Sequence, residues 1–257
     1  MNEILRHELK HVVPLEQATN FFNSCLPYCH ADLNADDFLS YEVSSLYYDT
    51  QSLRFYHDRE ESVGYRRKIR LRTYNLNDNL TAAFFEIKEK HKNQSNKKRL
   101  RFKNCDFLNR YRNYSQLTID ECLQYADDSS VSRELIYLNT KLCLYPLIIV
   151  RYLRRTLIPD SDSTLRITVD QRLTTGGSTL VKYDFKKEKF FLPHNMAIVE
   201  IKSNQHIPLW LQTLLLKAEF AKVRYSKYCE ALKYFEDKKY PPLSSATKFH
   251  NSIEHIS

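Results

Sequence analysis

Residues 64–74 read GYRRKIRLRTY, and this stretch decides the fold that we expect for the chain. Gly64 favours a turn, and charged and apolar residues alternate after it. Side chains of a β-strand point alternately to opposite faces, so Ile69 and Leu71 share one face. The opposite face carries the cations Arg66, Lys68, Arg70 and Arg72. The stretch therefore predicts a half-buried strand with a strongly basic side.

Strand patterns recur along the chain and alternate with helix patterns. Further strands are predicted over residues 4–13, 43–49, 53–59, 82–90, 97–103, 147–155, 164–172, 180–185 and 196–203. Helices are predicted over 14–29, from 118 onward, and over 131–143, 209–220 and 226–238. No Gly/Ser-rich linker divides these elements, so we expect one α+β domain over residues 1–240 and a polar tail over 241–257.

Most of the other predicted strands also carry one charged face. These faces hold Arg6, Glu8 and Lys10; Glu86, Lys88 and Lys90; Tyr152 and Arg154; Arg166, Thr168 and Asp170; and Glu200 and Lys202. One interpretation is the solvated side of an antiparallel sheet. The other is a sheet that closes on itself with its apolar faces under helices, so that the charged faces line a tunnel. A polyanion would neutralise that lining, and the embedded acids would orient cations or hold a divalent metal.

Composition narrows the classes of function. Lys and Arg number 39 and Asp and Glu number 31, and the net charge of +8 indicates an acidic partner. With only 3 glycines the chain cannot form a GxGxxG or Walker-type loop. Its 6 cysteines have no CxxC spacing, which favours reduced structural thiols over a zinc site. No signal peptide or membrane-spanning stretch is visible, so we expect a cytoplasmic protein.

Two features receive the plainer interpretation. Tyr47 and Tyr48 are expected in strand core and surface rather than in ligand contact. Lys97 and Arg99 are expected on a solvated face, with the mouth of a tunnel as the alternative position.

Eight stretches, in order from about residue 4 to 238, resemble the VTC family, the polyphosphate polymerase domain of the vacuolar transporter chaperone complex and its bacterial relatives. They are RHELKHVV near the start, SLYYDT at 45–50, GYRRKIRLRTY at 64–74, FFEIKEK at 84–90, VRYLRR at 150–155, LRITVD at 165–170, VEIK at 199–202 and RYSKY at 224–228. That family belongs to the triphosphate tunnel metalloenzymes. The resemblance implies an antiparallel closed β-barrel of about eight strands with flanking helices and a basic lumen.

The resemblance also implies roles for individual residues. Triphosphate or polyphosphate would be bound by Lys10, Arg70, Arg72, Lys88, Arg154, Arg166, Arg224 and Lys227, with Tyr152 bonded to a phosphate oxygen and Glu200 on Mn²⁺ or Mg²⁺. The charged faces add Arg6, Lys68 and Lys202 as phosphate contacts and Glu8 and Glu86 as metal ligands. We assign the catalytic part to Arg70, Arg72, Lys88, Arg154 and Arg166. Hydrolytic relatives open on E-x-E-x-K, where this chain has Arg6, Glu8 and Lys10, and this exchange favours synthesis over hydrolysis.

The function expected from the resemblance is transfer of the γ-phosphoryl group of ATP to a growing inorganic polyphosphate chain. Alternatives are a triphosphatase of the same fold and a non-catalytic module that binds polyphosphate or inositol polyphosphate. RNA binding is disfavoured, because the strongest strands interleave cations with Ile and Leu rather than with aromatic residues. Relatives work beside a membrane protein, so a separate membrane partner at the cytoplasmic face is part of the expectation.

Overall fold

The structure of the chain is a computed structural model that describes residues 7–239 except 33–34, 37–38, 78, 93, 185 and 205. The strands are β1 (His7–Pro14), β2 (Cys29–Ala31), β3 (Ser40–Asp49), β4 (Tyr65–Leu76), β5 (Asn79–His91), β6 (Gln94–Arg101), β7 (Tyr145–Pro159), β8 (Arg166–Thr175), β9 (Lys189–Phe190) and β10 (Met196–Ser203). The α-helices are α1 (Leu15–Cys25), α2 (Arg54–Glu60), α3 (Ile119–Leu123), α4 (Ser130–Leu142), α5 (Leu209–Ala218) and α6 (Lys227–Lys239). The 3-10 helices are η1 (Leu26–Tyr28), η2 (Asp106–Arg110) and η3 (Tyr114–Gln116). Arg6 and the predicted tail over 241–257 lie outside the described residues.

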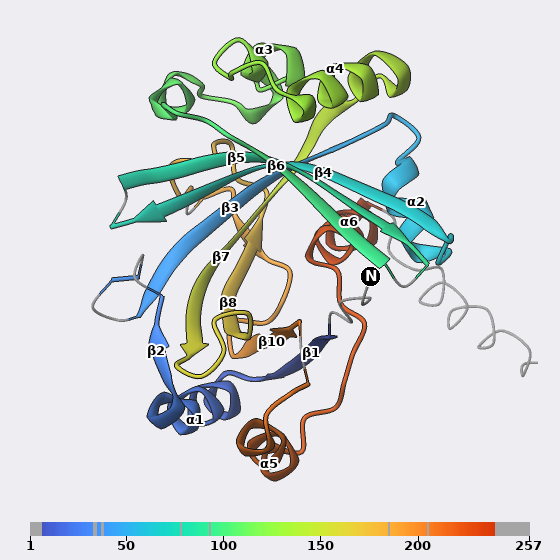
Figure 1. Ribbon diagram of the computed structural model, residues 1–257. Helices are drawn as coiled ribbons and strands as arrows, with labels where there is room; N and C mark the ends of the chain where they lie inside the picture. Colours follow the sequence, from blue (N-terminus) through green and yellow to red (C-terminus); the bar gives the residue numbers. More distant parts are fainter. Residues whose placement is uncertain are drawn as a thin grey trace, which may run out of the picture.

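One antiparallel sheet of ten strands forms the frame of the molecule. Its order is β1-β10-β8-β7-β3-β4-β5-β6, with β2 beside β7 and β9 beside β8. Within the described ranges no backbone pairing joins the end strands β1 and β6. Side chains span the gap instead, since Lys88 Nζ on β5 lies 3.7 Å from Glu8 Oε2 on β1. The predicted α+β architecture is confirmed, as a strongly curved sheet with flanking helices (Figure 1).

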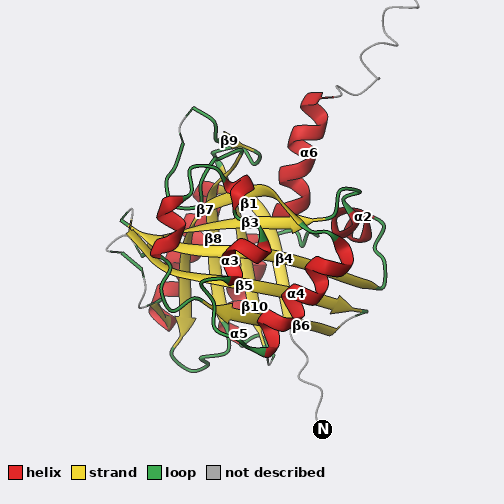
Figure 2. Cartoon of the chain, turned by 90° about the horizontal axis from the view of Figure 1, so that it is seen from above, coloured by secondary structure: helices red, strands yellow, loops and turns green. Residues whose placement is uncertain are grey.

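A first apolar layer covers the outer side of β4, β5 and β6. Ile69 on β4 is paired with Ile87 on β5, and both side chains are fully buried, as the alternating sequence predicts. They belong to one cluster with Ile119 of α3 and Leu135 of α4. Figure 2 shows α3 and α4 lying across these strands. The charged side of the hairpin must therefore face the concave side of the sheet.

A second apolar layer covers the outer side of β1, β8 and β10. Ile167 on β8 and Val199 on β10 pack with Phe22 of α1 and Leu211 of α5. In Figure 1 these helices lie at the end of the molecule opposite to α3 and α4. Helices thus cover both outer surfaces, as expected for a sheet that buries one face.

Helix α6 packs against the concave side of the sheet. Tyr228, Ala231 and Leu232 form a third cluster with Tyr47 of β3 and Val150 of β7. Figure 1 shows α6 within the curve formed by β3, β7 and β8. Residues just before and at the start of this helix are consequently held beside the charged strands.

The strand predicted over 53–59 is wrong, because these residues form the helix α2. The backbone N–H groups of Phe55 and Tyr56 donate to the Asp49 carboxylate at 2.9 and 3.1 Å, and the N–H of Arg54 donates to Thr50 Oγ1 at 3.1 Å. These side chains satisfy the N–H groups that a helix start leaves free. The cap comes from the preceding strand, so the apolar alternation of 53–59 by itself gives no sign of it.

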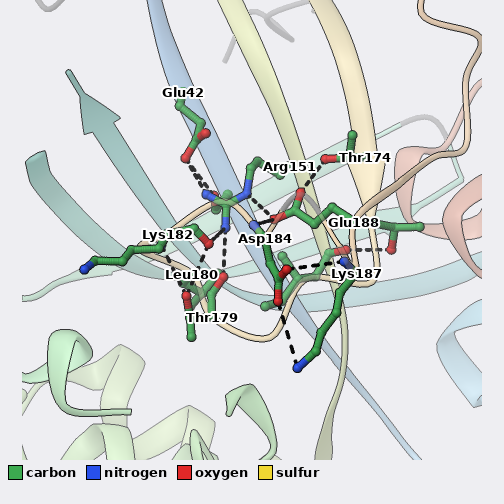
Figure 3. A network of polar contacts seen from close by, with 12 residues as sticks. Glu42, Arg151, Thr174, Thr179, Leu180, Lys182, Asp184, Lys187 and Glu188 are labelled. Atoms are coloured by element: carbon green, nitrogen blue, oxygen red, sulfur yellow. Dashed lines mark hydrogen bonds and ion pairs between the residues drawn. The ribbon is translucent and has the colours of Figure 1, made fainter. Parts of the chain in front are cut away.

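The strand predicted over 180–185 is also wrong, because the described residues there form an irregular segment held against the sheet (Figure 3). Arg151, only 2% exposed, donates from Nη2 to the carbonyl oxygens of Thr179 at 2.8 Å and Lys182 at 3.0 Å. Its Nε donates to Glu188 Oε1 at 2.9 Å, and its Nη1 donates to Glu42. These bonds satisfy the backbone that strand pairing would otherwise satisfy.

Candidate active site

Charged side chains from both halves of the chain meet on the concave side of the sheet, which we call the inner face. It comprises Glu8, Lys10, Lys68, Arg70, Arg72, Glu86, Lys88, Tyr152, Arg154, Asp170, Glu200 and Lys202, together with Ser226 and Lys227 at the start of α6. Long-range contacts establish the convergence. Lys68 Nζ donates to Ser226 Oγ at 2.6 Å, and Lys227 Nζ lies 2.6 Å from Asp170 Oδ2. Groups that are far apart in the sequence therefore form one site.

The first cluster surrounds Glu86, which is 1% exposed. Arg70 donates to its Oε2 from Nε at 2.7 Å and from Nη2 at 2.5 Å. Arg99 donates to its Oε1 from Nε at 2.9 Å and from Nη2 at 2.6 Å, and Lys97 Nζ lies 3.3 Å away. Burial alone would raise the pKa of Glu86, but Arg70 and the other cations outweigh it and hold the pKa well below its usual range. Of the two roles predicted for an embedded acid, these contacts favour orienting the arginines over binding a metal.

The second cluster surrounds Asp170, which is fully buried. Arg154 donates to the two carboxylate oxygens at 2.6 and 2.7 Å, and Lys227 contacts the same group. Burial would raise the pKa of Asp170, but Arg154 and Lys227 outweigh it and lower the pKa to about 2. Both cations lie close to the ring of Tyr152, at 5.1 and 5.0 Å from its centroid. The Tyr152 hydroxyl accepts a bond from Arg72 Nη2 at 3.1 Å.

The third cluster joins the first strand to β10. Lys10 Nζ lies 2.8 Å from Glu8 Oε1 and 3.5 Å from Glu200 Oε1, and Lys202 Nζ lies 3.1 Å from Glu200 Oε1. Burial lowers the pKa of Lys10, yet the carboxylates of Glu200 and Glu8 outweigh it, so that the pKa rises above its usual value. This cluster is the part of the inner face where acids are not already saturated by arginine.

Glu8 and Glu200 are the two carboxylates of the inner face that could hold a divalent cation if one binds there. Across the described part of the chain, no group of three or more His, Cys, Asp and Glu side chains is arranged to hold a metal ion. Mg²⁺ is commonly bound through one or two carboxylates, with water and substrate phosphate completing its shell. Two hard carboxylates beside Lys10 and Lys202 are compatible with Mg²⁺ or Mn²⁺.

Lys68 and Lys88 are the cations with the weakest compensation. Burial lowers the pKa of each ammonium group to about 8. Tyr47 on β3 lies near Lys68, and Arg70 Nη1 donates to the Tyr47 hydroxyl at 3.1 Å. Burial raises the pKa of Tyr47, but Arg70, Arg72 and Lys68 outweigh it and lower the pKa to about 8. The Tyr47 shift has the sign that nearby positive charge produces, and the lysine shifts have the sign that burial produces.

The remaining predicted residues lie toward the rim. Arg166 is the first residue of β8, is exposed, and pairs in register with Lys202. Arg224 lies in the segment before α6, close enough to Arg66 that it adds to burial and Arg59 in lowering the pKa of Arg66. Arg6 lies outside the described residues.

Two residues that lie on the inner face were not predicted there from the sequence. Tyr47 was expected in the strand core or at the surface, and Ser226 was given no role. The signal for Tyr47 is the alternation of β3, because Val43, Ser45 and Tyr47 share a face and Arg72 Nε donates to Ser45 Oγ at 3.1 Å. Tyr48 points the other way, and its hydroxyl donates to the carbonyl of Leu117 at 2.6 Å in the outer layer.

Two surface hollows lie away from this site. One of about 760 Å³ is lined by Thr50, Gln51, Ser52, Leu142, Cys143 and Tyr145. The other, of about 460 Å³, lies beside the irregular segment and is lined by residues that include Arg112, Lys182 and Lys187. Neither is lined by a residue of the inner face.

A model of the VTC domain matches residues 5–236. The chain belongs to the VTC domain family. That match spans every cluster of the inner face, from Glu8 to Lys227. No curated protein sequence matches this VTC domain chain.

Solved structures agree on the fold. A Hippeastrum protein described as an adenylyl cyclase candidate with a dominant triphosphatase activity is 12% identical, with a TM-score of 0.52 over 88% of this chain and 95% of that chain. A candidate adenylate cyclase from Bacillus halodurans is 12% identical, with a TM-score of 0.51 over 86% of this chain and 95% of that chain. The VTC domain thus shares its overall fold with these two proteins.

Within the described residues, the VTC domain has no helix that is both long and apolar enough to cross a membrane.

Proposed function

We propose that this VTC domain is a metal-dependent polyphosphate polymerase that transfers the γ-phosphoryl group of ATP to inorganic polyphosphate. The observation that carries the proposal is the pair of clamps on one face, in which Glu86 fixes Arg70 and Asp170 fixes Arg154. A guanidinium held in a fixed plane binds phosphate oxygens without reorganising during the reaction. Arg72, Lys88 and Arg166 complete the catalytic set, with Lys10, Lys68, Tyr152, Lys202, Arg224 and Lys227 as further phosphate contacts. Arg6 is retained as a phosphate contact from the sequence alone.

In phosphoryl transfer the protein mainly positions the reacting groups and neutralises their charge. The attacking group is the terminal phosphate of the chain, which is already anionic and needs no general base. Arg70 would hold the transferred group, while Arg72, Arg154, Lys227 and Tyr152 would bind the neighbouring phosphates. Lys10 keeps Glu8 and Glu200 in place beside them. When bound there, Mg²⁺ or Mn²⁺ would supply Lewis-acid neutralisation of the phosphate oxygens.

A triphosphatase is the second candidate, and the likeness to the Hippeastrum protein favours it. Water would then replace the polyphosphate end as the acceptor on the same inner face. Arg6 in place of the first acid of E-x-E-x-K supports the polymerase, because it removes one carboxylate that could activate water. A non-catalytic polyphosphate or inositol polyphosphate module would use the same cations without turnover.

The proposal extends to the setting of the enzyme. Residues 1–240 would form one domain, with ATP and polyphosphate rather than nucleic acid as ligands. A separate membrane protein is the proposed partner, which would place the domain at the cytoplasmic face of a membrane.

The test is incubation with ATP and Mn²⁺ followed by product sizing, for the wild type beside Glu200→Ala. A polymerase makes a long polymer, and loss of a metal carboxylate should lower its rate by at least about tenfold. Release of orthophosphate without polymer identifies the triphosphatase. Tight binding without turnover, unaffected by Glu200→Ala, identifies the binding module.

A further inference from the structure

Aromatic side chains gather at one end of the inner face, next to its arginines. The rings of Tyr74 and Phe84 meet edge-on with centroids 5.8 Å apart, and Tyr41 lies 5.9 Å from Tyr74. Phe84 on β5 is the register partner of Arg72 on β4, so the aromatic group lies directly beside a cation that we assign to phosphate binding. Tyr74 and Phe84 are partly exposed, which leaves them accessible to a ligand on the inner face.

The Arg99 guanidinium lies over one ring of this aromatic group. Its Cζ is 4.4 Å from the centroid of the Phe84 ring, and its Nε and Nη2 both donate to Glu86. The guanidinium is thus held by the Phe84 ring and by two hydrogen bonds to the Glu86 carboxylate. The side chain of Arg99 remains 37% exposed. Proteins stack unpaired bases on aromatic rings and on guanidinium planes of this kind.

The charges around Tyr74 connect this group to the phosphate site. Burial would raise the pKa of Tyr74, but Arg72, Arg99 and Arg154 outweigh it and lower the pKa. A ligand with a flat apolar part here would carry its negative charge directly onto those arginines. A nucleoside triphosphate has that shape, whereas inorganic polyphosphate has no part that stacks.

The other end of the inner face has a different chemistry. Lys68 on β4 pairs with Lys88 on β5, which pairs with Lys97 on β6, so each position in that layer is a cation. Beyond it, Arg59 and Arg224 lie near Arg66. A chain of phosphates suits that end better than a nucleobase does. The aromatic end of the inner face therefore suits the base of a donor nucleotide, and the cationic end suits its phosphates.

We infer that Phe84, Tyr74 and the Arg99 guanidinium form a stacking site for the purine base of the donor nucleotide, with its γ-phosphate directed toward Lys68 and Lys88. This inference rests on the proposed function, because it assigns the donor of that reaction. Stacking reads the flat face of a base rather than its edge, so ATP and GTP should bind similarly, and CTP and UTP more weakly.

The test compares ATP with tripolyphosphate, which has the same phosphates and no base. Calorimetric titration gives the Kd of both ligands for the wild type, Phe84→Ala, Phe84→Leu and Phe84→Trp. Phe84→Ala and Phe84→Leu should raise the Kd for ATP about tenfold, or about 1.4 kcal/mol at 25 °C. The Kd for tripolyphosphate should change less than about twofold, since it has no base to stack on Phe84. Phe84→Trp should restore the affinity for ATP.

Arg99→Lys separates stacking from charge, because it keeps the cation and loses the plane. This variant should raise the Kd for ATP more than the Kd for tripolyphosphate. Phe190→Ala is the matched aromatic control, since Phe190 is exposed on β9 and should leave both Kd values unchanged. If Phe84→Ala and Phe84→Leu raise the Kd for ATP and for tripolyphosphate equally, or leave both Kd values unchanged, the stacking site is contradicted. The proposed phosphate site is not contradicted by that result. A wild type that binds neither ligand overturns the proposed function as well.

Discussion

Acidic side chains on the inner face fix the cations rather than cancel them. Glu86 receives two N–H groups from Arg70 and two from Arg99, and Asp170 receives two from Arg154, which leaves the other donors of Arg70 and Arg154 directed elsewhere. Lys68 donates to a neutral hydroxyl, and Lys88 lies at 3.7 Å from a single Glu8 oxygen, so burial prevails and lowers the pKa of each to about 8. A bound polyanion should therefore change the charge of these two lysines.

A pH dependence follows from Lys68 and Lys88. A bound polyanion favours the charged ammonium, so its binding at pH 8 should take up protons and should weaken as the pH rises from 7 to 9. The effect on the unliganded protein has the opposite sign. The cost of burying the two charges is fully present below pH 8 and is relieved as the pH rises from about 8 toward the ordinary lysine pKa, about 10.4.

Calorimetry at pH 8 in two buffers of different ionisation enthalpy measures this proton uptake. ATP is the ligand of choice, because the last pKa of a phosphate monoester is about 6 and its own protonation contributes little. Lys68→Arg is the control, since arginine stays charged and should remove about half of the uptake. An enthalpy that does not depend on the buffer would contradict the assignment of these two lysines.

Local elements differ in how much of their structure the sequence reveals. The β4–β5 hairpin was predictable, because strict alternation places Ile69 and Ile87 in the outer layer and the cations on the inner face. Helix α2 was not, because its cap is the Asp49 carboxylate, which also accepts a bond from the Tyr228 hydroxyl at 2.5 Å. Contacts between residues far apart in the sequence leave no periodic signal in it.

Arg151 gives a prediction at the scale of one element. Arg151→Leu leaves Glu188 buried without its cation and should destabilise the fold by about 3–5 kcal/mol. The double variant Arg151→Leu/Glu188→Leu should recover a large part of that loss, since it removes both charges. Denaturant unfolding of the wild type, both single variants and the double variant measures the coupling. Additive losses in the double variant would show that the pair does not hold the segment over 179–188.

The whole molecule explains why the site residues were easier to find than their arrangement. Period-2 patterns identified charged faces on separate strands, and the resemblance to the VTC family placed them on one barrel. The ion-pair partner of each cation could not be predicted from the sequence. Glu86, Asp170 and Glu200 each have several cations nearby, and the curvature of the sheet determines which of them are close enough to pair. The same curvature brings α6 inside, where Ser226 and Lys227 join the strands.

The central claim is that cations from separate elements bind a single phosphate chain. Titration of tripolyphosphate into the wild type and four variants at pH 7 tests it most directly. One binding site per chain is predicted, with the Kd raised at least about tenfold in Arg70→Ala, Arg154→Ala and Lys227→Ala, because a charge-assisted contact contributes about 1.5–3 kcal/mol. Arg67→Ala is the matched control, since Arg67 pairs with Glu89 on the opposite side of β4 and should keep the wild-type Kd. Several sites per chain, or wild-type affinity in Arg70→Ala and Arg154→Ala, would contradict the account.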